Sequence, residues 1–199
     1  MISKMLLLDS IKNKKNVVLK FVIPLVIVSA SFQVGYGNIT LVMLLIFAVI
    51  TGSGLKIVKL KTSGVYNRLL ISPIKKRDLF FEITLVTSFL YFLQFIPALL
   101  VAGFYESPLI ILYALIAIMI VVFIGILTGI HAQGFGEIHL YSILFFIPLI
   151  GFTMINSDIS LVFPFIAIVH SNYTIFTLTI PCITLLAFSL LLLVDVNRL

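Results

Sequence analysis

The chain has 199 residues, of which 62% are hydrophobic and 10% are charged, and its net charge is +6. Soluble domains contain about 25% charged residues, so this composition excludes an ordinary soluble enzyme and predicts an integral membrane protein. The basic balance does not indicate nucleic-acid binding, because membrane proteins gather Lys and Arg in their cytoplasmic loops.

Six apolar runs predict membrane-spanning helices. A spanning helix needs about 20 mostly apolar residues, and its backbone groups must pair within the helix because lipid offers no partners. We therefore expect an all-α integral membrane protein whose single domain occupies residues 1–199. In chain order, the predicted spans cover residues 17–32, 39–55, 80–102, 108–130, 138–154 and 173–194.

The distribution of charge orients these spans. Every Lys and Arg precedes the first span or lies in its first turn, lies between the second and third spans, or follows the sixth, whereas the opposite loops carry Glu106 and Asp158 and no basic residue. The positive-inside rule then predicts a multi-pass protein of the cell membrane with both termini in the cytoplasm. The basic residues expected to contact membrane lipid are Lys12, Lys14 and Lys15 in the N-terminal segment 1–16, and Lys75, Lys76 and Arg77 before the third span.

The cytoplasmic loop 56–80 carries seven of the 13 Lys and Arg residues. Within it, residues 58–71 predict one amphipathic helix that ends before Pro73. Gly64 in its middle costs about 1 kcal/mol relative to alanine, which indicates a kink or a close approach to a partner. Such a helix either lies on anionic lipid or docks into a cytoplasmic protein. The residues on its apolar face are Val58, Thr62, Val65, Tyr66, Leu69 and Leu70.

The run Gly64-Val-Tyr-Asn-Arg-Leu-Leu-Ile-Ser-Pro-Ile favours the second alternative. In sequence and in position, it resembles the coupling helix in the permease subunit of type-2 ATP-binding cassette (ABC) exporters, which have the type V exporter fold. In that family a Gly-x-x-x-x-Leu-Leu-x-x-Pro-x run contacts the ATPase. The resemblance implies an ATPase-coupling site formed by Gly64, Val65, Tyr66, Arg68, Leu69, Leu70 and Pro73.

Two departures from the family pattern limit what the resemblance carries over. The family often has an acidic residue shortly before the glycine, where this chain has Lys59, Lys61, Thr62 and Ser63. It also often has a lysine at the start of the third span, where this chain has Glu82. We therefore do not transfer the salt bridges of the family to this chain.

The resemblance implies a permease dimer, of two identical or two different chains, with separate ATPase subunits that hold ATP and Mg²⁺. This chain has no P-loop, so we expect neither a cofactor nor enzymatic activity in it. No ionisable residue lies clearly in mid-span, which favours a hydrophobic or amphipathic substrate over a small ion. The family implies a drug, a lipid, haem or a peptide, moved outward.

Three weaker features complete the prediction. His131, Glu137 and His139 lie in the turn after the fourth span and suit a gate or a second ATPase contact better than a metal site, so we expect no metal. The Gly125-x-x-x-Gly129 pair predicts close helix packing within the chain. Residues 151–172 are apolar but interrupted, which favours short re-entrant helices.

Two other functions fit the same composition. The first is a six-span substrate-capture subunit of an importer, which needs a polar ligand site on the outer loops. The second is a membrane immunity or assembly protein without transport activity, in which the basic loop only binds lipid. The outer loops here are short and poor in polar residues, which disfavours the importer subunit.

Overall fold

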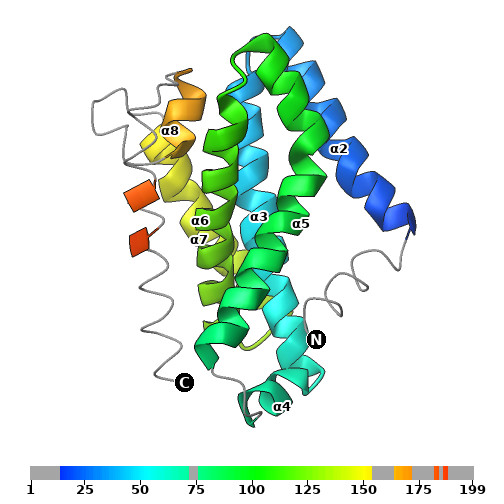
Figure 1. The fold of residues 1–199 in the computed structure, drawn as a ribbon, viewed down its shortest axis with the longest axis vertical. Coiled ribbons are helices and arrows are strands. Elements are labelled where there is room, and N and C mark those ends of the chain that lie inside the picture. Colours follow the sequence, from blue (N-terminus) through cyan, green and yellow to red (C-terminus); the bar gives the residue numbers. More distant parts are fainter. Residues whose placement is uncertain (1–13, 72–75, 154–163, 172–181, 184–185, 188–199) are drawn as a thin grey trace.

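The computed structural model describes residues 14–71, 76–153, 164–171, 182–183 and 186–187. In these residues the chain is helical and contains no strand, which confirms the all-α prediction (Figure 1). The helices are α2 (Lys14–Gln33), α3 (Gly37–Thr62), α4 (Val65–Ile71), α5 (Lys76–Tyr105), α6 (Ile110–His131), α7 (Phe135–Thr153) and α8 (Pro164–Val169).

Three of these helices are long and apolar enough to cross a membrane: α3, residues 78–105 of α5, and α6. Two shorter apolar helices, Val18–Gln33 and Phe135–Gly151, lie within α2 and α7. The length and composition of these helices are those of a membrane protein. The predicted sixth span, 173–194, lies outside the described residues except at 182–183 and 186–187.

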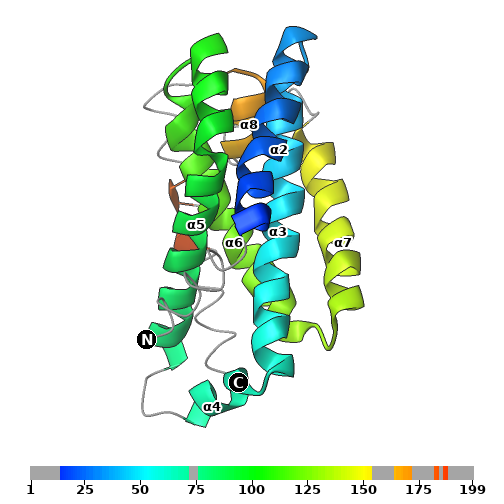
Figure 2. The same cartoon turned by 90° about the vertical axis from the view of Figure 1, so that its right-hand side faces the viewer.

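The helices α3 and α6 form the centre of the bundle. They make the most extensive contact between any two described elements; in Figure 2, α5 lies on one side of them, α7 on the other, and α2 in front of α3. The outer helices expose large apolar side chains, such as Val26, Phe89 and Leu144. Large apolar side chains exposed on several helices suit a surface that faces lipid.

Small residues bring α3 and α6 close together along one stretch of their contact, which we call the α3–α6 seam: Ser53, Gly54, Gly125 and Gly129. A Cβ added at Gly129 would lie 2.7 Å from Ile57 Cβ and 2.8 Å from the Gly54 carbonyl oxygen. One added at Gly125 would collide with Ser53 Oγ and lie 2.7 Å from the Ile50 carbonyl oxygen. The Gly125-x-x-x-Gly129 pair therefore packs within the chain, as predicted.

The predicted continuous helix over residues 58–71 is wrong. Helix α3 runs on to Thr62, and α4 begins only at Val65. Between them Gly64 adopts a φ of +70°, a left-handed conformation that glycine reaches without steric cost and that ends helices. Its N–H donates to the Lys61 carbonyl at 3.0 Å. A Cβ at Gly64 would meet nothing within 4 Å, so the glycine serves the turn and no close contact within the described chain.

At the end of the bundle opposite α4, polar side chains join three elements. Asn38 Nδ2, in the first turn of α3, donates to Ser171 Oγ at 2.9 Å, and Ser171 Oγ donates to Glu106 Oε2 at 2.7 Å. Ser171 directly follows the turn that ends α8, a short buried helix packed on α6 and α3. Of the predicted re-entrant region, α8 is described, whereas residues 154–163 lie outside the described residues.

Candidate functional site

Helix α4 lies across the end of the bundle, in the connection from α3 to α5 (Figures 1 and 2). Tyr66 anchors it, because its side chain is only 7% exposed. The Tyr66 ring meets Phe80 of α5 edge to face, with 6.3 Å between ring centroids and 73° between planes. Aromatic pairs of this geometry contribute about 0.5–1.5 kcal/mol beyond the area they bury. Val65, the first residue of α4, is half-buried beside it.

The other side of α4 faces outward. Arg68 is exposed, and Ile71 at the end of the helix is 85% exposed. Of the remaining predicted contact residues, Leu69 and Leu70 belong to α4, but their side chains lie outside the described part of the structure, as does Pro73. An exposed aliphatic residue one turn from an arginine suits contact with a partner surface.

Lys61, in the last turn of α3, contacts the C-terminal end of α6. Its Nζ donates to the carbonyl oxygens of Ile130 and Ala132, the latter at 3.0 Å. Carbonyls at a helix C-terminus have no partner within the helix and carry partial negative charge, so a cation stabilises them. We call this pair of hydrogen bonds the Lys61 cap.

The Lys61 cap joins three structural elements at one point. Lys61 Nζ lies 5.9 Å from the centroid of the Tyr66 ring on α4. Its charge is also attracted by the Glu137 carboxylate in the first turn of α7. Glu137 in turn accepts a hydrogen bond from the Gln133 backbone N–H at 2.7 Å. The end of α3, the anchored side of α4 and the α6–α7 turn therefore share one set of interactions.

Sequence reasoning missed this role of Lys61. Lys61 was left off the apolar face of the predicted helix and was given no partner, because its acceptor carbonyls lie about 70 positions further along the chain. A usable signal was present, since lysine is favoured in the last turn of a helix near unpaired carbonyls. Which helix end it caps could be found only from the fold.

The other predicted residues are more dispersed. His131 ends α6 and His139 lies in α7, and both are exposed, whereas Glu137 is half-buried. Among the described residues no three His, Cys, Asp or Glu side chains form a group that could hold a metal ion.

The basic residues predicted at the lipid interface are described only in part. The backbones of Lys14 and Lys15 begin α2, and those of Lys76 and Arg77 begin α5. Their side chains, together with Lys12 and Lys75, lie outside the described part of the structure.

Comparison with known proteins does not assign the chain to a family. No family model, no curated protein and no solved structure matches it. The likeness to an exporter permease therefore rests on the residues from Gly64 to Pro73 and on their place between two long apolar helices.

Proposed function

We propose that the chain is the transmembrane permease subunit of an ABC exporter. It has six spans and cytoplasmic termini in the cell membrane, forms a dimer, and moves a hydrophobic or amphipathic substrate outward with energy from a separate ATPase subunit. The observation that carries the proposal is α4: a short, separate helix, anchored by Tyr66 and presenting Arg68 and Ile71 outward. It connects two helices that are each long enough to cross a membrane.

The Lys61 cap gives α4 a mechanical role in this proposal. A partner that pushes on α4 displaces the end of α3 and, through Lys61, the C-terminal end of α6. The α3–α6 seam continues that connection into the membrane, because its atoms leave no space to absorb movement. ATP-driven closure of two ATPase subunits would thus be passed to the centre of the bundle.

The distribution of polar groups supports this orientation. The described Lys and Arg residues lie in the N-terminal half of α2, the C-terminal half of α3, α4 and the start of α5. At the opposite end Asn38, Ser171 and Glu106 are hydrogen-bonded to one another. Asn38 Nδ2 and Ser171 Oγ donate within this group, whereas Asn38 Oδ1 is buried without a hydrogen-bond partner among the described residues.

The proposal is tested by purifying the tagged chain from its native membranes in mild detergent and identifying the proteins that accompany it. We expect a stoichiometric subunit with a P-loop, and we expect it to be lost in Ile71→Asp and Arg68→Glu, and in the Leu69→Asp/Leu70→Asp double variant. Ile71 is 85% exposed, so its replacement should leave the permease folded.

Val34→Asp is the matched control, because Val34 is also a large exposed apolar residue, 68% exposed, but lies at the opposite end of the bundle. It should retain the ATPase. A preparation with no P-loop subunit, or one whose P-loop subunit survives every α4 substitution, would contradict the proposal. Such a result would favour the assembly-protein or importer alternatives.

A further inference from the structure

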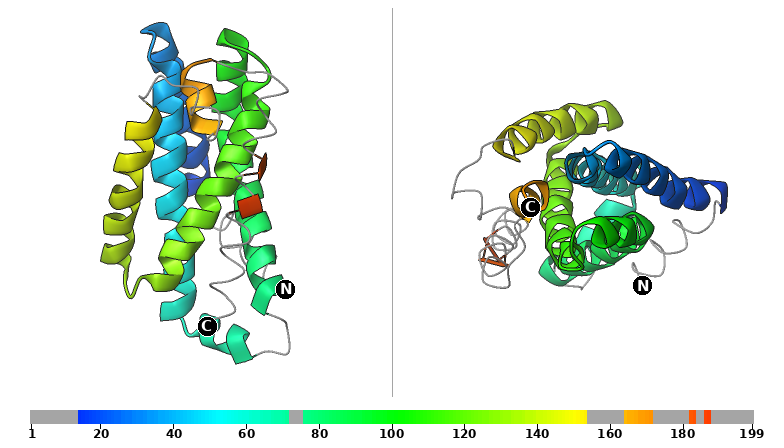
Figure 3. Two further views of the ribbon diagram at one scale, coloured as in Figure 1. Left: turned by 90° about the vertical axis from the view of Figure 1, so that its left-hand side faces the viewer. Right: turned by 90° about the horizontal axis from the view of Figure 1, so that it is seen from above.

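A large cavity lies on the side of α3 that faces away from the seam. It is bounded chiefly by α2, α3 and α5, and its volume is about 640 Å³. The N-terminal end of α2 diverges from the other two helices there (Figures 1 and 3). Pockets of about 300–1,000 Å³ are typical of small-molecule sites, and this one has room for roughly 20 groups the size of a water molecule.

The wall of this cavity is divided by chemistry. Ile23, Leu44 and Phe95 contribute an apolar part, whereas Lys20, Lys56 and Lys59 contribute positive charge. Among the described residues that line it, there is no Asp or Glu. Lys56 and Lys59 come from the last turns of α3, toward α4, whereas Lys20 comes from the second turn of α2, whose N-terminal end lies at mid-height of the bundle (Figure 1).

The apolar and cationic parts are separated along α3. Leu44 and Lys56 are 12 positions apart, which is about 18 Å of helix. A molecule that filled the cavity would thus meet hydrocarbon at one end and ammonium groups at the other. That is the pattern of an amphiphile with one acyl chain and a negatively charged head.

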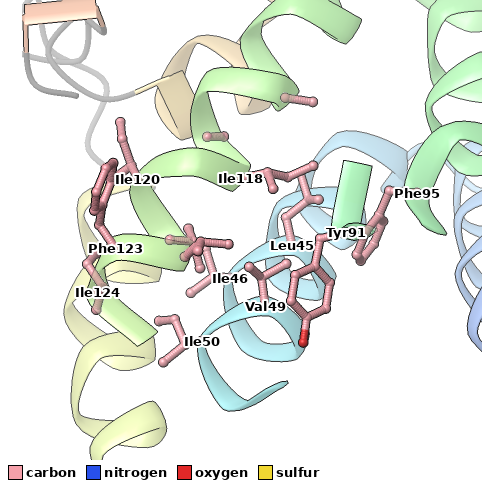
Figure 4. Close-up of a cluster of buried hydrophobic side chains, with 14 of the residues drawn as sticks. Leu45, Ile46, Val49, Ile50, Tyr91, Phe95, Ile118, Ile120, Phe123 and Ile124 are labelled. Carbon is pink, nitrogen blue, oxygen red and sulfur yellow. The ribbon is translucent and has the colours of Figure 1, made fainter. Parts of the chain in front are cut away.

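At the cationic end of the cavity, Lys56 packs against an aromatic ring. Lys56 Nζ lies 4.8 Å from the centroid of the Tyr91 ring. Tyr91 and Phe95 both project from α5 toward α3 (Figure 4), and the Tyr91 hydroxyl lies against Gly52, where a Cβ would collide with it. The glycine admits the tyrosine, and the tyrosine ring attracts the lysine ammonium to the cavity wall.

We propose that this cavity binds one single-chain anionic amphiphile, a fatty acid or a lysophospholipid. Its phosphate or carboxylate contacts Lys56 and Lys59, with Lys20 at the entrance, and its acyl chain runs along α3 toward Leu44. Ammonium groups form charge-assisted hydrogen bonds with such heads. The inference stands independently of the ATPase partner, because it concerns binding and not transport.

The test uses tryptophan fluorescence, since the chain contains no tryptophan. Phe95→Trp places a single reporter in the cavity wall, and Phe89→Trp places one at an exposed site of the same helix, where Phe89 is 58% exposed. Each variant is reconstituted in lipid nanodiscs and titrated with lysophosphatidic acid that carries bromine on its acyl chain, which quenches tryptophan on contact. Leu44→Trp is a second cavity reporter if Phe95→Trp does not fold.

We expect quenching of the cavity reporter to saturate, and to require about tenfold less brominated lysophosphatidic acid than brominated lysophosphatidylcholine with the same chain. The exposed reporter should be quenched equally by both lipids and without saturation. Lys56→Gln/Lys59→Gln should abolish the preference for the anionic lipid, and Ala48→Phe, which fills the cavity from α3, should abolish saturation.

Three outcomes would overturn the proposal. The first is equal quenching of the cavity reporter by the two lipids. The second is a preference for the anionic lipid that survives loss of both lysines, which would assign the selectivity to another surface. The third is a cavity reporter that behaves like the exposed one, which would mean that it senses only bulk lipid. Brominated dodecanoate in place of the phospholipid distinguishes a carboxylate head from a phosphate head as the better ligand.

Discussion

The two faces of α3 use small residues for opposite purposes. On one face Gly54 lets the backbone of α6 come close, and a Cβ there would lie 3.1 Å from the Gly125 carbonyl oxygen. On the other face, two positions earlier, Gly52 makes room for the hydroxyl of Tyr91 beside a cavity of about 640 Å³. Gly54 therefore allows α3 and α6 to pack closely, whereas Gly52 accommodates the Tyr91 side chain beside the cavity.

This difference indicates that the two faces of α3 have different roles in the bundle. Closely packed helix interfaces switch between discrete arrangements and do not deform continuously. We therefore expect α3 and α6 to move together as one rigid unit at the seam. The side of α3 toward α2 and α5 has fewer packed atoms around the cavity, so it suits a ligand or a change in helix spacing. Four substitutions test this contrast.

The largest expected effect belongs to the seam. Gly125→Ala should lower the free energy of unfolding by about 2–3 kcal/mol, because the added methyl group meets Ser53 Oγ and the Ile50 backbone carbonyl. Unfolding would be followed by circular dichroism during titration with SDS. Gly151→Ala in α7 is the control, since a Cβ there meets nothing within 4 Å. Equal stability of the two variants would contradict the close packing of the seam.

The Lys61 cap should come next. Lys61→Met leaves two carbonyls at the end of α6 without their donor and should cost about 1–3 kcal/mol in the same titration, whereas Lys61→Arg should recover part of the loss. The exposed Lys59 two positions earlier provides the comparison, and Lys59→Met should cost less than about 1 kcal/mol. If the two methionine variants are equally stable, Lys61 does not join α3 to α6.

The sign of the stability change caused by Gly64→Ala distinguishes a left-handed turn at Gly64 from an uninterrupted helix. At a φ of +70°, Gly64→Ala should destabilise the protein by about 1–2 kcal/mol, because a Cβ is disfavoured in the left-handed region. In an uninterrupted helix over residues 58–71, the same change would stabilise it by about 1 kcal/mol. Thermal unfolding of the wild type, Gly64→Ala and Gly64→Asn gives the sign, with asparagine expected between the other two.

The smallest effect is expected on the cavity face. Gly52→Ala introduces a methyl group against the tip of the Tyr91 side chain, which can turn toward the cavity. The gain in helix propensity, about 1 kcal/mol, should offset the cost of that turn and leave the free energy of unfolding nearly unchanged. A loss as large as that of Gly125→Ala in the SDS titration would show that both faces of α3 are equally tightly packed.

The sequence predicted features that depend on local composition. The bounds of the fourth span, 108–130, agree closely with α6, because apolar length alone defines such a helix. The Gly125 and Gly129 pair was also found, since its spacing is local. A kink was one of the two alternatives that Gly64 indicated, but the full break between α3 and α4 was not predicted, because the residues on both sides of it are helical and share one period. The Lys61 cap was missed because its acceptors are distant in the chain.

The candidate site was predicted only in outline. Position in the chain singled out α4, but its division into an anchored side with Tyr66 and an outward side with Arg68 and Ile71 follows from packing against α5. The cavity could not be predicted, because Lys20 of α2 and Lys56 and Lys59 of α3 line it together only in the folded bundle. The ATPase, the dimer and the direction of transport stay predictions.

The most direct test of the contrast between the two faces is a pair of distance distributions measured by pulsed electron spin resonance in nanodiscs. Cys182, the one cysteine of the chain, is first replaced by serine so that label sites can be chosen freely. One label pair, at Thr62 of α3 and His131 of α6, spans the C-terminal end of the seam, where Lys61 is hydrogen-bonded to Ala132. The other pair, at Val22 of α2 and Phe89 of α5, spans the cavity; all four positions are exposed. We predict a narrow distribution for the seam pair that lysophosphatidic acid does not change, and a broader one for the cavity pair that the lipid narrows. A seam pair as broad as the cavity pair, or a cavity pair that ignores the lipid, would contradict the account.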